Sequence, residues 1–452
     1  MYLGLERCQR WCERSVNRRI FAAIVSIGGF TILVKLTAVA KQLVIASRFG
    51  TSDALDAFLI AFLAPSFAIN VAAGSFSAAL IPTFIEVRER EGQDAAQRLF
   101  SSVMVLSVVL ILAISGVLAA FSPTIIQIIG SGFSPEKQAL TRSLFFLTLP
   151  LLIISGLAAI WASILNAQER FALAAVAPVM TPVAAVLAIL LLGRVWGIYA
   201  LAVGTVGGGI FEAALLGRGL KRQGFSILPR WHGLNPAVRQ VARQYAPMAA
   251  GALLMSGTDV VDQSMAAMLG PGSVSALSYG NKVVSLIIGI GSLSLSTAIF
   301  PHFSRMAAAN DWTGIRATVK TYARLIVLIT VPITLALVYF SKPIVAVLFE
   351  RGAFTAGDAH LVGRVQAFYL LQAPFYFLGI MGVRLLSALK MNHILMGISA
   401  INLFTNIVAN YVFMRYLGLP GISLSTSVVY FMSVILVYLS LRSQLRMGGS
   451  HG

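Results

Sequence analysis

Long apolar stretches follow one another along most of this chain, and short polar stretches separate them. A membrane-spanning helix needs about 20 mainly apolar residues, and these stretches reach or approach that length. They are too long and too continuously apolar for the strands of a membrane barrel, so the pattern predicts helices. The twelve predicted spans are 20–47, 55–83, 99–121, 141–165, 171–193, 196–217, 244–269, 274–301, 321–341, 361–388, 393–415 and 419–441.

A polar and basic stretch divides the twelve spans into two groups of six. The sequence therefore predicts an N-terminal six-helix lobe at 1–217, a cytoplasmic linker at 218–243 and a C-terminal six-helix lobe at 244–452. Pro229 should interrupt any helix within the linker. We expect this linker to lie at the inner leaflet, partly as an amphipathic helix.

The two groups of spans resemble each other in sequence. SFSAALIPTF at 75–84 matches SLSTAIFPHF at 294–303, which lies 219 residues further on. GIYALAVGTV at 197–206 opens the sixth span, and GISLSTSVVY at 421–430 opens the twelfth. Six spans separate the members of each pair, so both copies have the same orientation in the membrane. The lobes should then be related by a pseudo-two-fold axis along the membrane normal.

The composition agrees with a polytopic membrane protein. Hydrophobic residues make up 58% of the chain, the mean hydropathy is +0.85, and charged residues make up 11%, against roughly 25% in a soluble domain. The first apolar run is longer than a signal-peptide core and has no early cleavage site, so we expect it to remain as a span. Cys8 and Cys12 are too few for a disulfide framework, and we interpret them as reduced thiols.

The basic residues predict the topology. The net charge is +18, and with a cytoplasmic N-terminus 22 of the 34 Lys and Arg residues fall on the cytoplasmic side. Seven fall on the outer side and five within spans. This excess predicts that both termini are cytoplasmic. It also explains the positive charge without a nucleic-acid partner.

Motifs of enzymes and cofactor sites are absent from the sequence. It contains no H-E-x-x-H, P-loop or G-x-S-x-G, and its five histidines fall in loops or at span ends. GTVGGG at 204–209 lies inside a span, where small residues favour close helix packing. The sequence therefore predicts a protein that is not an enzyme and holds neither a cofactor nor a metal.

Three lysines within the predicted spans are candidate substrate-binding residues. A charge near the middle of the bilayer costs at least about 2.5–3.5 kcal/mol, so such residues usually face a cavity or a partner. Lys35 and Lys41 lie in the first span, and Lys282 lies in the eighth. Lys41 is nearer the outer end of its span, where snorkelling to the interface is an equally good interpretation.

Asp259 and Asp262 are candidates for ion coupling. They are three residues apart in the seventh span and so share one helix face. Two carboxylates there should not both be ionised without a cation or a basic partner. The alternatives are a proton or sodium site, a counter-ion for the lysines, or a structural ion pair. Asp56 begins the second span, and we expect it to cap that helix.

Several stretches together resemble the MviN/MurJ-like flippases of lipid-linked oligosaccharides. These flippases belong to a superfamily that also includes multidrug exporters and polysaccharide flippases. The stretches that carry the resemblance are RFGTSDALDAFLIAFLAPS at 48–66, GSFSAALIPTF at 74–84, ILNAQERFALAAVAP at 164–178, GSVSALSYGNKV at 272–283 and FERGAFTAGDA at 349–359.

The resemblance implies two six-helix lobes around a V-shaped cationic cavity, and alternating access for a lipid-diphosphate glycan. It also implies cavity arginines where this chain has Lys35, Lys41 and Lys282. Lysine keeps the charge but lacks the bidentate fork of arginine. A further cavity arginine of those flippases corresponds to a position near Ile69, where this chain lacks the charge. Asp259 and Asp262 are not part of the pattern that the resemblance implies. These departures favour a surface-glycan precursor over lipid II as the substrate.

The sequence thus predicts an inner-membrane flippase for a polyprenyl-diphosphate-linked oligosaccharide. Its expected partners are the lipid-linked glycan, membrane lipids and a glycan polymerase or glycosyltransferases. One alternative is a cation-coupled multidrug exporter that uses Asp259 and Asp262, although the buried lysines would repel a cationic substrate. A membrane enzyme is a weaker alternative, because the predicted outer loops are short and carry no catalytic cluster.

Overall fold

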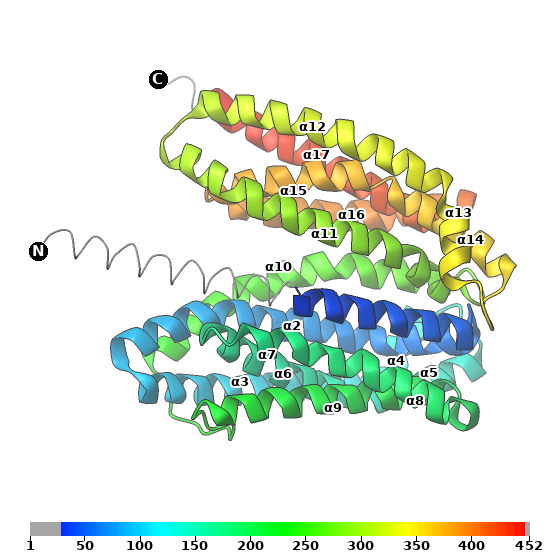
Figure 1. The fold of residues 1–452 in the computed structure, drawn as a ribbon, viewed down its shortest axis with the longest axis horizontal. Coiled ribbons are helices and arrows are strands. Elements are labelled where there is room, and N and C mark those ends of the chain that lie inside the picture. Colours follow the sequence, from blue (N-terminus) through cyan, green and yellow to red (C-terminus); the bar gives the residue numbers. More distant parts are fainter. Residues whose placement is uncertain (1–28, 448–452) are drawn as a thin grey trace, which may run out of the picture. The chain divides into compact units, whose positions relative to one another are not determined.

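The structure, a computed structural model, describes residues 29–447, and every regular element within them is a helix (Figure 1). Cys8, Cys12 and the arginines of the predicted cytoplasmic N-terminus lie outside the described residues.

The helices of the first half begin with Gly29–Phe49, which precedes α2. They continue with α2 (Asp53–Glu91), α3 (Gln93–Ala120), α4 (Ser122–Ile129), α5 (Pro135–Thr148), α6 (Pro150–Ala167), α7 (Phe171–Val176), the 3-10 turn η1 (Ala177–Val179), α8 (Met180–Trp196) and α9 (Ile198–Arg222). The second half consists of α10 (Pro236–Ala267), α11 (Ser273–Ala308), α12 (Trp312–Tyr339), α13 (Ser341–Phe349), α14 (Ala356–Leu370), α15 (Ala373–Ala388), α16 (Asn392–Leu417) and α17 (Leu419–Met447).

The helices confirm the prediction of an all-α polytopic membrane protein. Within the described residues, eleven helical segments are long and apolar enough to cross a membrane. The remaining predicted span, the seventh at 244–269, lies mainly in α10, which has the necessary length but a more polar sequence that includes Asp259 and Asp262. The two groups of six helices agree with the predicted repeat, and α3 and α12 have the same length of 28 residues.

Two predicted spans are divided at equivalent places in the two halves. α5 ends at Thr148 and α6 begins at Pro150, and α14 ends shortly before α15, which carries Pro374 in its first turn. Proline has no amide hydrogen to donate and fits the first turn of a new helix. A short helix, α4 or α13, precedes each divided span. These short helices lie in stretches that the apolar pattern predicted as outer loops.

The chain forms two compact units that do not coincide with the two halves of the sequence. Among the described residues, the first unit contains 29–45, 68–121 and 143–250. The second contains 46–67, 122–142 and 251–447. The second unit therefore includes the start of α2, and also α4 and the beginning of α5, although these elements belong to the N-terminal half of the sequence.

Each unit has its own apolar core. In the first unit, Phe84, Leu99, Phe100 and Leu220 are completely or almost completely buried among α2, α3, α6 and α9. In the second, the core includes Phe303 and lies among α11, α12, α15 and α17. Many of the large side chains outside these cores remain exposed, as expected for helices that face lipid.

The central part of the predicted linker is an irregular segment that runs along α3. Its two ends are helical, because residues 218–222 finish α9 and α10 begins at Pro236. Ser226 donates its amide to Gln97 Oε1 at 3.0 Å, and His232 donates its amide to Ser102 Oγ at 3.2 Å. Phe225 is buried against the rings of Phe84 and Phe100. The predicted amphipathic helix is thus replaced by the ends of two long helices.

Candidate functional site

The C-terminal half of α10 carries the two predicted acidic residues, and the structure gives them different environments. Asp262 is 7% exposed, whereas Asp259 is exposed. They lie three residues apart on one side of the helix, as predicted, but the neighbouring helices cover only the position of Asp262.

Neutral polar groups surround the Asp262 carboxylate. Asn406 Nδ2 donates to Asp262 Oδ1 at 2.9 Å, and Asn410 Nδ2 donates to the same oxygen at 2.6 Å. Thr426 Oγ1 lies 3.4 Å from Asp262 Oδ2. Ser425 donates its hydroxyl to Asn410 Oδ1, which fixes the orientation of that amide. The cluster therefore joins α10, α16 and α17 through polar side chains in the second unit.

Helical spacing explains why these side chains converge. Asn406 and Asn410 are four residues apart on α16, so they occupy the same face one turn from each other. Ser425 and Thr426 lie near the start of α17, which follows α16 after the single residue Gly418. Gly418 has a φ of 65°, a left-handed conformation that glycine adopts without strain. The tight turn brings the polar ends of both helices to α10.

The chemistry of this cluster suits a monovalent cation or a proton. Each hydrogen-bond partner of Asp262 in the described part of the chain is uncharged, so an ionised carboxylate here needs a positive species to offset its burial. Asn406 would present its carbonyl oxygen after a 180° turn of its amide. Within residues 29–447, no group of three His, Cys, Asp or Glu forms a metal-binding cluster. One carboxylate with neutral oxygens is therefore poorly matched to a divalent metal.

Lys282 lies near the other carboxylate. It is half-buried on α11 and lies near Asp259, although the two side chains form no ion pair within the described residues. The structure thus brings together one of the predicted lysines with one of the predicted aspartates, both in the second unit. Asp262 is hydrogen-bonded to neutral groups instead.

The other two predicted lysines lie on the helix Gly29–Phe49 in the first unit. Lys35 is exposed and forms neither an ion pair nor a hydrogen bond within the described residues. Lys41 is half-buried. Lys35 therefore has a side chain available to an anionic group.

Asp56 differs from the prediction that it caps its own helix. It is fully buried, and its carboxylate accepts hydrogen bonds from the amides of Gly272 and Ser275, both at 2.8 Å. These amides belong to the N-terminus of α11, so Asp56 caps α11 instead of α2. Lys137 Nζ, from α5, lies 3.0 Å from the same carboxylate. Lys137 is only 9% exposed.

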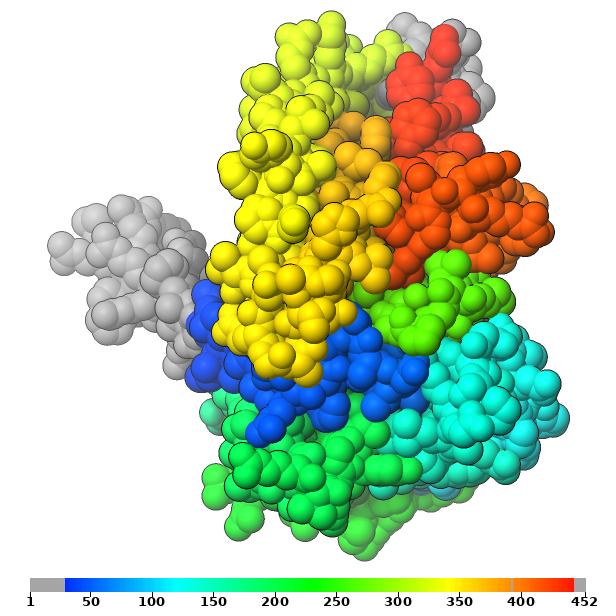
Figure 2. All heavy atoms as spheres, turned by 90° about the vertical axis from the view of Figure 1, so that its right-hand side faces the viewer, coloured from blue at the N-terminus to red at the C-terminus, as the bar shows by residue number. Residues whose placement is uncertain are grey.

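Further contacts surround this ion pair in the second unit. Lys137 also pairs with Asp53 at 2.5 Å and lies 4.0 Å from the ring of Phe133. Ala353 donates its amide to Ser47 O at 2.8 Å, so the turn after α13 lies against the end of the helix Gly29–Phe49 (Figure 2). The cluster is thus held by side chains and by backbone.

The sequence prediction missed the partners of Asp262, although a signal was present. Asn402, Asn406 and Asn410 recur every four residues within an apolar span, which places three amides on one helix face. The polar residues Ser423, Ser425 and Thr426 lie in the GISLSTSVVY segment, which had been interpreted only as part of the repeat.

Comparison with known proteins identifies the family of the sequence. The family model described as "Lipid II flippase MurJ" matches residues 45–452. A protein of that name from Burkholderia cenocepacia is 26% identical over 449 residues, which cover 94% of this chain and 84% of the relative. A probable lipid II flippase from Synechocystis is 26% identical over 419 residues, covering 90% and 78% of the two chains. These relatives are named flippases, in agreement with the prediction of a transporter and not an enzyme.

Solved structures confirm the fold. Lipid II flippase MurJ in an inward closed conformation has a TM-score of 0.80 at 23% identity, covering 92% of this chain and 87% of that one. An inward-facing multidrug resistance MATE transporter has a TM-score of 0.77 at 13% identity, covering 94% and 99%. At these identities the likeness concerns the fold, which the two kinds of transporter share.

Proposed function

We propose that this chain, which belongs to the MurJ family of lipid II flippases, moves a polyprenyl-diphosphate-linked oligosaccharide across the bacterial inner membrane by alternating access. The observation that carries the proposal is the family match over residues 45–452, which contain eleven of the twelve predicted spans and the end of the first. It supports the flippase over the cation-coupled exporter. The names of the relatives favour lipid II as the substrate, whereas the lysines in place of arginines had favoured another lipid-linked glycan.

Lys35, Lys41 and Lys282 are the proposed binding residues for the diphosphate. Lysine ammonium groups attract phosphate as point charges, and a different affinity in the two facing states would drive exchange. The exposed and unpaired side chain of Lys35 supports this role. Cytoplasmic termini and a glycan polymerase or glycosyltransferase as partner are further parts of the proposal, and they follow from the charge pattern and the substrate class.

The direct test is complementation of bacteria depleted of their own lipid II flippase. We expect the wild-type chain to restore growth, and the Lys35→Ala/Lys41→Ala/Lys282→Ala variant to fail while remaining at normal levels in the membrane. The control Lys320→Ala/Lys342→Ala removes two lysines from outside the predicted spans. Normal growth with the triple variant would contradict the assigned site. Failure of the wild type, together with flipping of another lipid-linked glycan in reconstituted vesicles, would replace lipid II as the substrate.

We also propose that the Asp262 cluster binds the coupling ion. A cation stabilises a buried carboxylate without a basic partner more strongly than an exposed one. Ion binding would therefore favour the facing state in which Asp262 is buried most. Asp262→Asn should abolish the dependence of transport in vesicles on a sodium or proton gradient. Imposing each gradient separately would identify the ion, and unchanged dependence in the variant would contradict the assignment.

A further inference from the structure

A cavity of about 620 Å³ lies in the first unit between α6 and α9, with Ile227 of the irregular segment at one end. This volume is within the range of roughly 300–1,000 Å³ that is usual for small-ligand sites. All of its lining residues belong to the first unit, whereas the Asp262 cluster and Lys282 belong to the second. None of the predicted site residues lines it.

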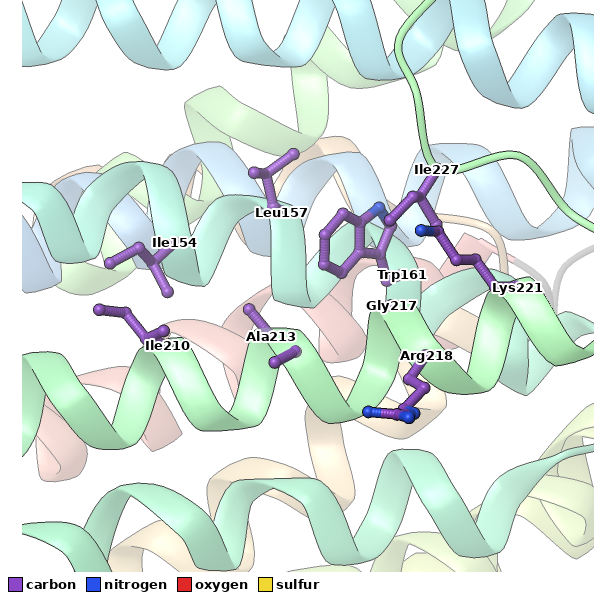
Figure 3. A pocket seen from close by; sticks show the side chains of 10 residues that line it. Ile154, Leu157, Trp161, Ile210, Ala213, Gly217, Arg218, Lys221 and Ile227 are labelled. Atoms are coloured by element: carbon purple, nitrogen blue, oxygen red, sulfur yellow. The ribbon is translucent and has the colours of Figure 1, made fainter.

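The cavity is apolar along most of its length and cationic at one end. Figure 3 shows Ile154 and Ile210 at one end, and Arg218 and Lys221 at the other. Arg218 and Lys221 are exposed, and neither side chain has a hydrogen-bond or ion-pair partner within the described residues. They are three residues apart on α9, so both face the same side of the helix.

Trp161 lies at the cationic end of the cavity, and the packing of α9 accommodates its ring. Gly217 faces this ring, since a Cβ atom there would lie 2.9 Å from Trp161 Cζ3. The indole Nε1 of Trp161 is buried and has no acceptor within the described residues. Tryptophan is typical of the level of the lipid headgroups, where its ring is apolar and its N–H finds a polar partner.

We propose that this cavity binds an anionic glycerophospholipid of the inner leaflet. The slot along α6 and α9 takes an acyl chain, and Arg218 and Lys221 hold the phosphate. Arginine offers a planar fork and lysine a point charge, and basic pockets between helices on the cytoplasmic side suit such headgroups. The positive-inside pattern predicts that this end of α9 is cytoplasmic.

The basic residues at the end of α9 also have a simpler explanation, which is stabilisation of the helix dipole. The lining of the cavity distinguishes this explanation from lipid binding. Basic residues in the last turn of a helix interact favourably with its dipole, and Lys221 and Arg222 both occupy that turn. Arg222 does not line the cavity, whereas Arg218, one turn earlier, does. If the cavity binds a lipid, Arg218 and Lys221 should contribute to binding and Arg222 should not. If these charges only stabilise the helix dipole, Arg222 and Lys221 should have the same effect.

The test is a titration of the purified full-length protein in neutral detergent with phosphatidylglycerol or phosphatidylethanolamine, followed by native mass spectrometry. We expect phosphatidylglycerol to bind more tightly to the wild type. Arg218→Ala/Lys221→Ala should weaken phosphatidylglycerol binding about tenfold or more, since each basic residue near an anionic lipid contributes about a fivefold change in affinity. It should weaken phosphatidylethanolamine binding much less, because the ammonium group of that headgroup offsets the charge of its phosphate. Arg222→Ala/Arg230→Ala removes the same charge from the same region outside the cavity and should retain the preference.

A second variant tests the apolar part of the cavity without changing its charge. Ala214 lines the slot and is exposed, so Ala214→Phe should fill it and weaken the binding of both lipids, with an unchanged melting temperature in lipid-free detergent.

Equal losses of phosphatidylglycerol binding in the two double variants would overturn the proposal, because they indicate diffuse surface charge. Stronger competition by a polyprenyl diphosphate than by phosphatidylglycerol would also overturn it and assign the cavity to the substrate. Neither result depends on whether the chain flips lipid II.

Discussion

Asp56 and Asp262 are both buried in the second unit, at 0% and 7% exposure, but they are stabilised in different ways. Asp56 has the ammonium group of Lys137 and two backbone amides of α11. Asp262 has two asparagine amides and a threonine hydroxyl, with no cationic side chain among its hydrogen-bond partners in the described chain. The Asp56 carboxylate is paired with a cation, and we call its surroundings the complete site. The Asp262 carboxylate lacks such a partner and requires a proton or a cation to offset its burial, so we call its surroundings the incomplete site. The comparison separates a carboxylate with a structural partner from the carboxylate that we propose to bind the coupling ion.

The largest expected effect follows from removing the lysine of the complete site. Lys137→Met should lower the free energy of unfolding by about 3–5 kcal/mol, because it leaves the charge of Asp56 buried without its partner. Denaturant unfolding in detergent measures this change. The variant Lys137→Met/Asp56→Asn should recover part of the loss, and a double variant less stable than the single one would show that the pair is not the cause.

The incomplete site should respond to ions where the complete site does not. If sodium is the ion, adding it at constant ionic strength should stabilise the wild-type protein by about 2.7 kcal/mol at one hundred times the dissociation constant. Asp262→Asn should remove this stabilisation, while Asp259→Asn, its exposed neighbour, should retain it. A sodium response that survives Asp262→Asn would place the ion elsewhere.

The asparagines of the incomplete site should contribute less than the lysine of the complete one. Asn410→Ala should destabilise the protein by about 1–3 kcal/mol, because the buried Asp262 oxygen loses its 2.6 Å donor. Thermal unfolding in detergent provides the measurement. Asn402→Ala is the matched control on the same helix, since Asn402 makes no hydrogen bond through its buried Oδ1. Equal effects of the two substitutions would argue against a specific role for Asn410.

The smallest expected effect concerns the second carboxylate beside Lys137. The Asp53 side chain is 56% exposed, so Asp53→Asn should change stability by less than about 1 kcal/mol despite its 2.5 Å contact with the lysine. The change should diminish further in high salt. A loss as large as that of Lys137→Met would show that exposure does not decide which of the two aspartates matters.

Much of the fold could be predicted because lipid imposes a simple rule on the backbone. Apolar runs long enough to span a bilayer must be helical, and each predicted span contains helix in the described residues. Hydropathy did not reveal the breaks near Pro150 and Pro374 or the short helices α4 and α13, because these remain apolar throughout. The assignment of residues 46–67 and 122–142 to the second unit depends on long-range contacts, which local patterns do not contain.

The candidate site was less accessible to prediction, because one half of it consists of uncharged residues. The cost of burying charge drew attention to Asp259, Asp262 and Lys282, and the structure places Asp259 and Lys282 near each other. Asn406 and Asn410 carry no charge and therefore attracted no attention, although their four-residue spacing was visible. The sequence contains no indication that Lys137 is buried beside Asp56, because the two residues are 81 positions apart.

The partners of Asp56 are synthesised at different times. Asp56 and Lys137 are separated by 81 residues, whereas the α11 amides follow Asp56 by 216 and 219 residues. The lysine is therefore available to the carboxylate long before Gly272 and Ser275 leave the ribosome. The early pair would lower the cost of holding both charges near the membrane during insertion. The second unit is completed only when a helix from the other half of the chain arrives at an acceptor that already exists.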